Sequence, residues 1–458
     1  MAMIGIIADD LTGAMTAGSL LSKAGVDTTV LLKTDYLRKG EPVCERQAVI
    51  LNLNSRSAPR EIAYRRVHDA VLRLRETGIR QFSKRIDTTL RGDIGTEIDA
   101  MLDALGEDYI AVMVPAMPQS NRILIGGYSI IDGVPLSKTS VAHDVKTPVR
   151  ESFVPRLLAS QTRRNIGYVE LDELLKGEDS LRKSLQKKRE DGVEILLVDA
   201  TSIEDVAMIA DTIVDLGWKT VSVDPGPFTE KMVLSRGWAA QRPMKLRRIR
   251  NKPEADDEGT VVVVAGSATP VTTMQINALR RVPGTHTVPV RVPLILSDEE
   301  ACRREIAGAV NQTVKLLKSS PVPRVIILAF ETTLTGELID LSRDRHRGFA
   351  EGDAADHMAT CLGRIVRETM NKAFGGVTGM YLTGGDIMAS TCRMLDAKGI
   401  ELIDYVIPQA DQGRLVGGPF AGLSLIGKGG LTGERNTAIQ CVNRLFDERK
   451  YNHAISKS

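Results

Sequence analysis

The sequence lacks the features that mark several common classes of protein. Its cysteines are few, widely spaced and odd in number, and they form no C-x-x-C pair, so a closed disulfide framework is excluded. This usage is typical of a reducing compartment, and we expect a cytoplasmic protein. No apolar run approaches the roughly 20 residues that a membrane-spanning helix needs. The cysteines are Cys44, Cys302, Cys361, Cys392 and Cys441.

An excess of charge of either sign is also missing. The chain has 60 basic and 58 acidic residues and a formal net charge of +2, which gives no global field for nucleic acid or an anionic membrane. Any anion must therefore bind at a local site, and small molecules are the expected partners. A signal peptide is not expected, because Asp9 and Asp10 interrupt the apolar start of the chain.

The length and the apolar pattern predict two α/β domains. At 458 residues the chain exceeds a single core, which stops growing near roughly 250 to 300 residues. Short apolar runs alternate with helical patterns, so each domain should have a mostly parallel sheet flanked by helices, with the active site in the cleft between them. The predicted parts are an N-terminal domain over residues 1–245, a charged linker over 246–258 and a C-terminal domain over 259–458.

One polar stretch, residues 83–95, is the centre of the predicted chemistry. It follows an expected strand over 79–82 and precedes an expected helix over 96–105, so it should form a loop at the carboxyl end of a strand, where open α/β sheets bind ligands. A solvated turn with chance ion pairs is the alternative. The side chains expected to bind substrate are Lys84, Asp87, Thr88, Thr89 and Arg91, with Asp87 able to accept a hydroxyl proton.

Two further strand ends carry polar side chains. Asp9 and Asp10 follow an apolar run over residues 4–8 and precede a helical pattern, so they are placed to orient a substrate hydroxyl or to hold Mg²⁺. A helix N-cap would explain one of them and not both. Arg56 follows another strand and could reach the same anion as Arg91.

The middle of the N-terminal domain predicts a hairpin. Gly126-Gly127 and the Asp132-Gly133 turn punctuate a short strand pattern that could cover a site. The dipeptide His143-Asp144 follows, and one histidine beside one aspartate is more often surface structure than a proton relay.

Three glycine-containing loops follow strands of the C-terminal domain. They begin at Gly266-Ser267, at Gly384-Gly385-Asp386 and at Gly427-Lys428-Gly429-Gly430, and the first two precede helices. Bare backbone and a helix N-terminus suit phosphate, so we expect a nucleotide site. A true P-loop is excluded, because Gly429 stands where Ser or Thr should bind Mg²⁺.

Together these stretches resemble the four-carbon acid sugar kinase family, the ATP-dependent kinases of D-threonate, D-erythronate and 3-oxo-tetronate. The resemblance runs over nearly the whole chain, and the order and spacing of the motifs make it specific. The motifs are Ala8 to Ala14, Lys84 to Gly95, Gly126-Gly127, Asp132 to Pro135, Thr147-Pro148-Val149, Gly266-Ser267 with Pro270-Val271-Thr272, and Gly384-Gly385.

The resemblance implies a sugar-acid site in the N-terminal domain and a nucleotide site in the C-terminal domain. The positions that would face the acid match Asp10, Arg56 and the stretch from Lys84 to Arg91. Those that would face ATP match Ser267, Gly384, Gly385, Asp386 and the loop with Gly427, Lys428 and Gly430.

We therefore expect a kinase that uses ATP and Mg²⁺ to phosphorylate a hydroxyl of a small sugar acid, with Asp10 or Asp87 as the base. The specific acid, the hydroxyl, the metal ligands and the formation of a homo-oligomer stay open at this point. The chain departs from the family at Thr16, where an aspartate is usual, and at Asp386, where a glutamate is usual. An alternative is thus a nucleotide- and sugar-acid-binding protein impaired in turnover, and a Mg²⁺ phosphohydrolase using Asp9 and Asp10 is a second.

Overall fold

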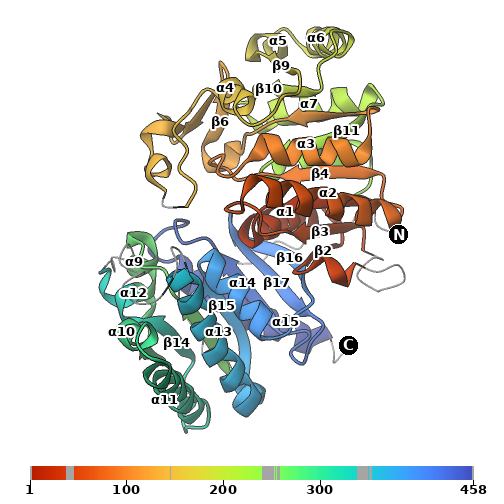
Figure 1. The fold of residues 1–458 in the computed structure, drawn as a ribbon. Helices are drawn as coiled ribbons and strands as arrows, with labels where there is room; N and C mark the ends of the chain where they lie inside the picture. The colour runs from red at the N-terminus through yellow and green to blue at the C-terminus, as the bar shows by residue number, and fades with distance from the viewer. Residues whose placement is uncertain are drawn as a thin grey trace. The chain divides into compact units, whose positions relative to one another are not determined.

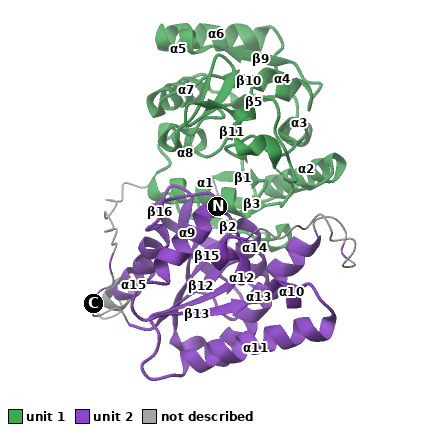
Figure 2. Ribbon diagram, turned by 90° about the vertical axis from the view of Figure 1, so that its left-hand side faces the viewer, with its two compact units in different colours: residues 1–244 green, residues 245–458 purple. Residues whose placement is uncertain are grey.

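The chain divides into two units, Met1–Met244 and Lys245–Ser458 (Figures 1 and 2). The computed structural model describes residues 3–37, 46–144, 146–239, 258–337 and 353–455, together with positions 252, 254 and 349. Most of the linker predicted over 246–258 lies outside the described residues. Each unit is an α/β structure built on its own mostly parallel set of strands, as the sequence predicts.

The strands of the N-terminal unit pair in the order β2-β3-β1-β4-β11-β5-β10-β9, and every neighbouring pair is parallel. Several of them are continuous apolar runs, such as Ile4–Ala8, because helices cover both faces of the sheet. The strands are β1 (Ile4–Ala8), β2 (Thr28–Leu31), β3 (Ala48–Asn52), β4 (Gln81–Arg85), β5 (Tyr109–Met113), β9 (Ile166–Val169), β10 (Ile195–Val198) and β11 (Lys219–Asp224).

Two helical layers enclose this sheet. Figure 2 shows α2 and α3 on one side of the strands and α1, α7 and α8 on the other. The second layer packs on β5 and β10 through a core that includes Phe228 and Met232. The helices are α1 (Leu11–Lys23), α2 (Arg60–Glu76), α3 (Ile94–Leu105), α4 (Val154–Ala159), α5 (Leu171–Leu175), α6 (Glu178–Glu190), α7 (Ile203–Asp215) and α8 (Pro227–Ser235).

The strand order creates a switch point at β1. The chain leaves β1 to build β2 and β3 on one side of it and then crosses to build β4 on the other. Helices that leave neighbouring strands toward opposite faces open a crevice at the carboxyl ends of those strands, and such crevices bind ligands in open α/β sheets. The carboxyl ends of β1, β3 and β4 therefore define the expected position of a site.

The loop predicted over residues 83–95 begins later than expected. Ser83, Lys84 and Arg85 continue β4, whose register pairs Lys84 with Ile7 of β1 and Val223 of β11. The prediction that these three residues lie in the loop was wrong, because a polar strand end can be buried when its side chains find charged partners. The predicted helix is confirmed as α3, which begins at Ile94.

The predicted hairpin is confirmed as a three-stranded antiparallel sheet of β6 (Arg122–Ile125), β7 (Tyr128–Ile131) and β8 (Val134–Pro135). Gly126 and Gly127 have φ of 60° and 73°, and Asp132 and Gly133 have φ of 49° and 79°. Two consecutive residues with positive φ form the type I′ turn that matches the twist of a hairpin.

The C-terminal unit has the strand order β13-β14-β12-β15-β18-β17-β16, parallel from β13 to β18 and antiparallel beyond it. The sequence analysis did not predict β13 or the pair β16 and β17. The strands are β12 (Thr260–Ala265), β13 (Thr285–Val290), β14 (Val325–Phe330), β15 (Val377–Thr383), β16 (Gly399–Ile407), β17 (Ala410–Val416) and β18 (Ser424–Lys428).

Helices again cover two faces of this sheet. On one side α9 packs on α15, and on the other α13 packs on α11 and α14. The chain leaves β12 for β13 and β14 on one side and returns to β15 on the other, so β12 is a second switch point. The helices are α9 (Pro270–Leu279), α10 (Val292–Ile295), α11 (Glu299–Leu317), α12 (Glu331–Thr335), α13 (Asp353–Ala373), α14 (Gly385–Met394) and α15 (Thr437–Ile455).

We also compared the helices with the requirements for a membrane-spanning segment. None of the helices in the described part of the chain combines the length and the apolar composition that a membrane crossing needs.

Candidate active site

Charged side chains from three strand ends meet at the switch point of the N-terminal unit. The Arg56 guanidinium, beyond β3, donates from Nε to Asp9 Oδ2 at 2.7 Å and from Nη2 to Asp10 Oδ1 at 2.7 Å. Arg85, the last residue of β4, donates from Nη1 to Asp9 Oδ1 at 3.2 Å and to Asp10 Oδ1 at 3.0 Å. The two aspartates that follow β1 are therefore held by arginines from both neighbouring strands.

Arg85 is a site residue that the sequence analysis missed. Its place directly after Lys84 was a signal, since the last side chains of a strand reach the ligand-binding edge of the sheet. Gly13 explains how the arginine fits, because a Cβ at this position would lie 1.5 Å from Arg85 Nη1. The glycine of the motif Ala8 to Ala14 thus leaves room for a guanidinium.

Asp10 has two functions in this arrangement. Its Oδ1 accepts from Gly13 N at 2.9 Å and caps α1, as expected for one of the two aspartates. Its Oδ2 has no protein hydrogen-bond partner among the residues that the structure describes, and its side chain is 22% exposed. Asp10 therefore keeps one accessible oxygen.

A second group of contacts surrounds Asp87. Arg91 donates from Nε to Asp87 Oδ2 at 2.7 Å and from Nη2 to Asp87 Oδ1 at 3.3 Å, and the Thr89 hydroxyl also bonds to this carboxylate. Arg91 Nη1 donates to Asp144 Oδ2 at 3.2 Å. The guanidinium expected to bind substrate thus has protein carboxylates on all three of its nitrogens, whereas Thr88 lies half-buried on the same turn.

The turn that follows Asp87 has an unusual backbone conformation. Leu90, which is buried, has a φ of 55°, a conformation that costs a non-glycine residue of order 1–3 kcal/mol. Such backbone strain is concentrated at functional sites, where the surrounding structure maintains it. The next turn residue with positive φ is Gly92, at 95°, which packs against Arg56.

The charges fix the protonation of the carboxyls. Burial alone would raise the pKa of Asp87, but Arg56 and Arg91 outweigh it and hold this pKa well below its usual value of 3.8. Burial is likewise outweighed at Asp9, where Arg56, Lys84 and Arg85 lower the pKa. Both groups are therefore ionised at neutral pH. For the Arg56 guanidinium, the opposing carboxylates overcome burial and raise the pKa well above its usual value.

Lys84 lies in the core and not on the surface of the site. Its side chain is 0% exposed, and its Nζ lies 2.6 Å from Glu97 Oε2 on α3 and donates to Arg85 O at 2.9 Å. The ammonium therefore has a buried partner of its own, and it acts on Asp9 as a nearby charge.

A cavity of about 460 Å³ borders this cluster within the N-terminal unit. Arg56 lines it, and Arg56 Nη1 has no protein hydrogen-bond partner in the described part of the chain. Lys146 and Arg150 line it too, beside the predicted motif Thr147-Pro148-Val149. The cavity thus has three cationic residues in its lining, which suits a carboxylate.

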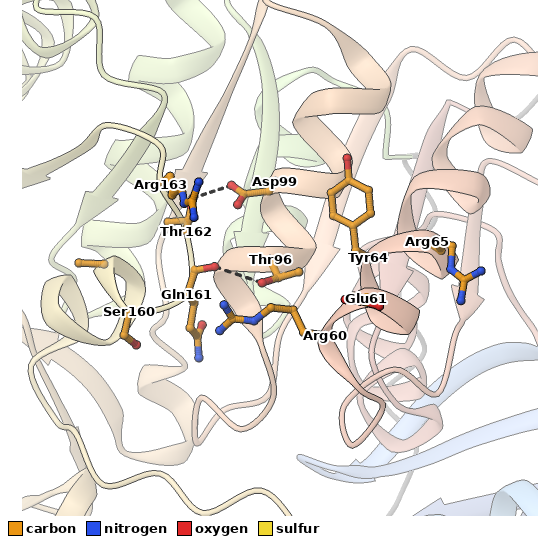
Figure 3. Close-up of a pocket in the computed structure, with 11 residues that line it drawn as sticks. Arg60, Glu61, Tyr64, Arg65, Thr96, Asp99, Ser160, Gln161, Thr162 and Arg163 are labelled. Atoms are coloured by element: carbon orange, nitrogen blue, oxygen red, sulfur yellow. Dashed lines mark hydrogen bonds between the residues drawn. The ribbon is translucent and has the colours of Figure 1, made fainter.

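A different cavity of the same unit, about 660 Å³, lies between α2, α3 and the segment after α4 (Figure 3). Figure 3 shows Thr162 bonded to Asp99 and Thr96 bonded to the Gln161 carbonyl, at 2.6 Å and 3.1 Å. None of the predicted site residues lines this cavity, and we assign no function to it.

The three glycine loops of the C-terminal unit meet at its switch point. They follow β12, β15 and β18, and together with the end of β14 and one face of α13 they enclose a cavity of about 380 Å³. This volume is in the range of small-molecule sites. Its lining includes Gly266, Ser267, Phe330, Met358, Gly384, Gly385, Asp386, Ile387 and Gly430.

Several of these positions require glycine or a small side chain. Gly384 has a φ of 105°, which L residues rarely adopt, and caps α14. A Cβ at Gly430 would lie 3.1 Å from Ser267 Oγ. The Gly430 carbonyl accepts from the Thr269 and Thr272 hydroxyls at 2.7 Å and 2.9 Å, so the β18 loop is fixed to the start of α9. The N-termini of α9 and α14 thus begin beside the cavity, where their helix dipoles favour an anion.

The prediction that Gly427 and Lys428 belong to the third loop was wrong. Both lie in β18 and are buried, because this strand pairs with β15 as far as Lys428. Lys428 Nζ donates to Gly429 O at 2.5 Å and to Thr432 O at 3.0 Å, and burial lowers its pKa to about 8. The buried Lys428 therefore stabilises the loop through these hydrogen bonds, and Gly430 is the residue of this motif that lines the cavity. Asp386 is exposed at its rim.

Comparison with known proteins agrees with this division. Residues 4–232 match the model of a sugar-binding N-terminal domain, and residues 262–438 match that of a nucleotide-binding C-terminal domain. A D-erythronate kinase from Heliobacterium modesticaldum is 35% identical over 449 residues, which cover 97% of this chain and 98% of that protein. The chain belongs to the four-carbon acid sugar kinase family.

Other relatives support the assignment. A D-threonate kinase from Bordetella bronchiseptica is 29% identical and covers 97% of this chain and 98% of its own length. A solved structure from Salmonella typhimurium has a TM-score of 0.74 at 22% identity, covers 95% of this chain and 98% of its own, and shows the same fold. As a member of the family the chain is a kinase, which is what the sequence analysis predicted.

Proposed function

We propose that the protein transfers the γ-phosphoryl group of ATP to a hydroxyl of a four-carbon sugar acid. The observation that carries the proposal is the pair of switch-point sites, one with an arginine–aspartate cluster and one with a glycine-lined cavity. A kinase of an acid sugar needs one site for the acid and one for the nucleotide, and membership of the family is consistent with both. Among the named relatives, the D-erythronate kinase is 35% identical and the D-threonate kinases are 29% identical, so erythronate is the first acid to test.

The residues of the C-terminal cavity fit a nucleotide. Ser267, Gly384, Gly385 and Gly430 present backbone and a hydroxyl to phosphate oxygens, and the φ of 105° at Gly384 supports a close approach. Phe330, Met358 and Ile387 supply apolar surface for a base. The bound nucleotide with Mg²⁺ supplies the phosphoryl group and neutralises its charge.

Asp386 fits a role in holding Mg²⁺. Its carboxylate is exposed at the cavity rim, in the first turn of α14, and Mg²⁺ is usually bound by one or two carboxylates together with phosphate oxygens. We therefore assign the metal to this side chain, which replaces the glutamate usual in the family.

In the N-terminal unit, Arg56 is our candidate for the acid's carboxylate. Arg56 lines the cavity of about 460 Å³, and Asp9 and Asp10 hold its Nε and Nη2. Arg91 and Thr89 then position Asp87, whose ionised carboxylate can accept a substrate hydroxyl. Lys84 supports the cluster through Glu97.

Asp10 is our candidate for the base. Both oxygens of Asp87 are engaged by Arg91, and those of Asp9 by Arg56 and Arg85, whereas Asp10 Oδ2 is available to accept the hydroxyl proton. The observed contacts thus favour one of the two aspartates that the sequence left open.

The alternative of a binding protein without turnover rested on Thr16. This residue is buried inside α1, and its hydroxyl donates to Thr12 O at 3.1 Å, so the helix itself accommodates the threonine. No observation favours loss of activity. Because the reaction uses ATP, we also propose that the protein works in the cytoplasm.

The test is an assay of ADP formation with ATP, Mg²⁺ and D-erythronate, D-threonate or 3-oxo-tetronate supplied separately. We expect ADP to form only when an acid is present, and phosphorus NMR to detect a new phosphate monoester. Removal of Mg²⁺ with EDTA should stop the reaction.

Two results would contradict the proposal. ADP formation at the same rate without any acid would indicate hydrolysis, and binding of both ligands without ADP would indicate the impaired alternative. Asp10→Asn is the matched control, because asparagine caps a helix as well as aspartate does but cannot take the proton.

A further inference from the structure

A cysteine–histidine cluster lies on the side of α13 that faces α11. Cys302 belongs to α11, and His357 and Cys361 are four residues apart on α13, hence on one face of that helix. Their ligand atoms lie within 4.8 Å of one another, and no other group of three metal-binding side chains in the described part of the chain does so. The proposed kinase reaction uses none of the three.

We propose that Cys302, His357 and Cys361 form a binding site for a zinc-like divalent cation. Thiolate sulfur and imidazole nitrogen are the ligands that Zn²⁺ prefers, and structural zinc sites are usually tetrahedral. The proposal concerns a site distinct from the nucleotide cavity and does not depend on the identity of the kinase substrate.

The distances match a tetrahedral ion. With bonds of about 2.3 Å to sulfur and about 2.05 Å to nitrogen, two sulfurs would be about 3.8 Å apart and a sulfur and a nitrogen about 3.6 Å apart. The observed Cys302 Sγ to Cys361 Sγ distance is 3.7 Å. His357 Nε2 lies 3.5 Å from Cys361 Sγ and 3.9 Å from Cys302 Sγ. The three ligand atoms thus already have nearly the required separations.

A fourth ligand and the burial of the cluster are consistent with a closed site. The Ile295 carbonyl oxygen, at the end of α10, is 3.1 Å from His357 Nε2. Without metal, Nε2–H donates to this oxygen; with metal, the imidazole proton moves to Nδ1, Nε2 binds the ion, and either this carbonyl or a water completes the tetrahedron. Cys302 and Cys361 are 8% and 4% exposed. Binding would release the two thiol protons.

The other buried cysteines show that burial alone does not create this arrangement. Cys392 and Cys441 are also free and buried, in α14 and α15. Neither belongs to a cluster of metal-binding side chains among the described residues.

A metal here would act on the wall of the nucleotide cavity. It would join α13 to α11, whereas Ala355, Met358 and Ala359 of the same helix α13 line the cavity. The cation would therefore stabilise the helix that forms this wall.

The test uses the full-length protein, reduced and freed of metal, and titrated with Co²⁺. We expect one equivalent to give the visible bands of tetrahedral cobalt and a near-ultraviolet charge transfer from thiolate. Zn²⁺ should then displace cobalt and abolish the bands, and Zn²⁺ alone should raise the unfolding temperature.

The variant Cys302→Ser/Cys361→Ser should lose the cobalt bands and the zinc-dependent shift. The control Cys392→Ser/Cys441→Ser removes the same number of buried cysteines and should keep both. If the first variant does not fold, His357→Asn, at a partly exposed position, should weaken the charge-transfer bands while leaving both thiols.

Reduced protein that shows no cobalt bands would overturn the proposal, and so would bands that persist in the Cys302→Ser/Cys361→Ser variant. A third result would also overturn it. Reduced wild-type protein would be exposed to air in the presence of excess Zn²⁺, and it would then contain a Cys302–Cys361 disulfide and no bound metal.

Discussion

The buried pair of Lys84 and Glu97 allows a quantitative test of the N-terminal unit. Their charged atoms are 2.6 Å apart, and their side chains are 0% and 4% exposed. Replacing one partner leaves a buried charge that must either stay unpaired or become neutral, and breaking such a pair costs about 3–5 kcal/mol. Lys84→Met should therefore destabilise the unit strongly.

The side chain left without its partner can become neutral, and the free energy of this change is the upper limit of the destabilisation. This limit depends on pH. Keeping a glutamate of ordinary pKa, about 4.3, protonated costs about 3.7 kcal/mol at pH 7 and about 1 kcal/mol at pH 5. For a lysine of ordinary pKa, about 10.4, the neutral form costs about 4.6 kcal/mol at pH 7 and about 2 kcal/mol at pH 9. Lys84→Met should thus recover stability as pH falls, and Glu97→Leu as pH rises.

Urea denaturation followed by tryptophan fluorescence measures the effect, since both tryptophans, Trp218 and Trp238, belong to the N-terminal unit. The double variant Lys84→Met/Glu97→Leu should recover at least half of the loss, because apolar side chains can replace a buried pair at little cost.

Lys219→Met is the matched control, because its pair with Asp108 is 59% and 77% exposed, and solvent screens such a pair so that its loss should hardly change stability. Equal losses at pH 5 and pH 7 in Lys84→Met would refute the reasoning. A double variant no more stable than either single variant would do the same.

Four further predictions concern the proposed site residues. Gly384→Ala, at a φ of 105°, should weaken ATP binding at least about tenfold by calorimetry, whereas Gly422→Ala, at a φ of 84° with nothing within 4 Å of the added Cβ, should not. Arg56→Lys keeps the charge but loses the planar fork, so the KM for the acid should rise about tenfold or more; an unchanged KM would place the carboxylate elsewhere. Asp10→Asn should lower kcat by about 10² to 10⁴ with little change in KM. Since its pKa is depressed, Asp87 should stay ionised above pH 3.8, so any acid limb of kcat near neutral pH should belong to another group and persist in Asp87→Asn; loss of the limb in that variant would argue against the assigned role.

The apolar pattern was sufficient for the two α/β units and for many individual elements. A five-residue apolar run such as Ile4–Ala8, ended by two aspartates, is typical of a strand buried on both faces, and the residues around Asp353–Ala373 have helical periodicity over 21 positions. Turn residues were equally informative, because Asp132-Gly133 adopts positive φ at little cost. These signals are local, so the sequence contains them without reference to the rest of the fold.

Three other strands gave weaker signals. The strand β9 alternates in burial but is only four residues long, and in the antiparallel pair β16 and β17 the alternation is interrupted. Their pairing depends on the neighbouring strands, and no local pattern specifies it.

The site was determined partly by sequence and partly by tertiary structure. The sequence placed Asp10, Arg56 and Asp87 at strand ends and the glycines at the start of helices, because strand, turn and helix signals are local. Only the strand order brought β1, β3 and β4 side by side and so joined these side chains into one cluster.

Whether a cationic side chain is buried or reaches the site also depends on partners elsewhere in the chain. Lys84 looked like a ligand in the sequence, yet Glu97, thirteen residues later on α3, takes it into the core, while Arg85 beside it reaches Asp9 and Asp10. Cys302 and Cys361 are far apart in the chain and meet only because α11 packs on α13. Alternation along a strand gives the two faces of the sheet, but the charge that each face meets comes from elements elsewhere in the chain, and for that reason the tertiary structure alone decided which polar residues are buried and which are available to a ligand.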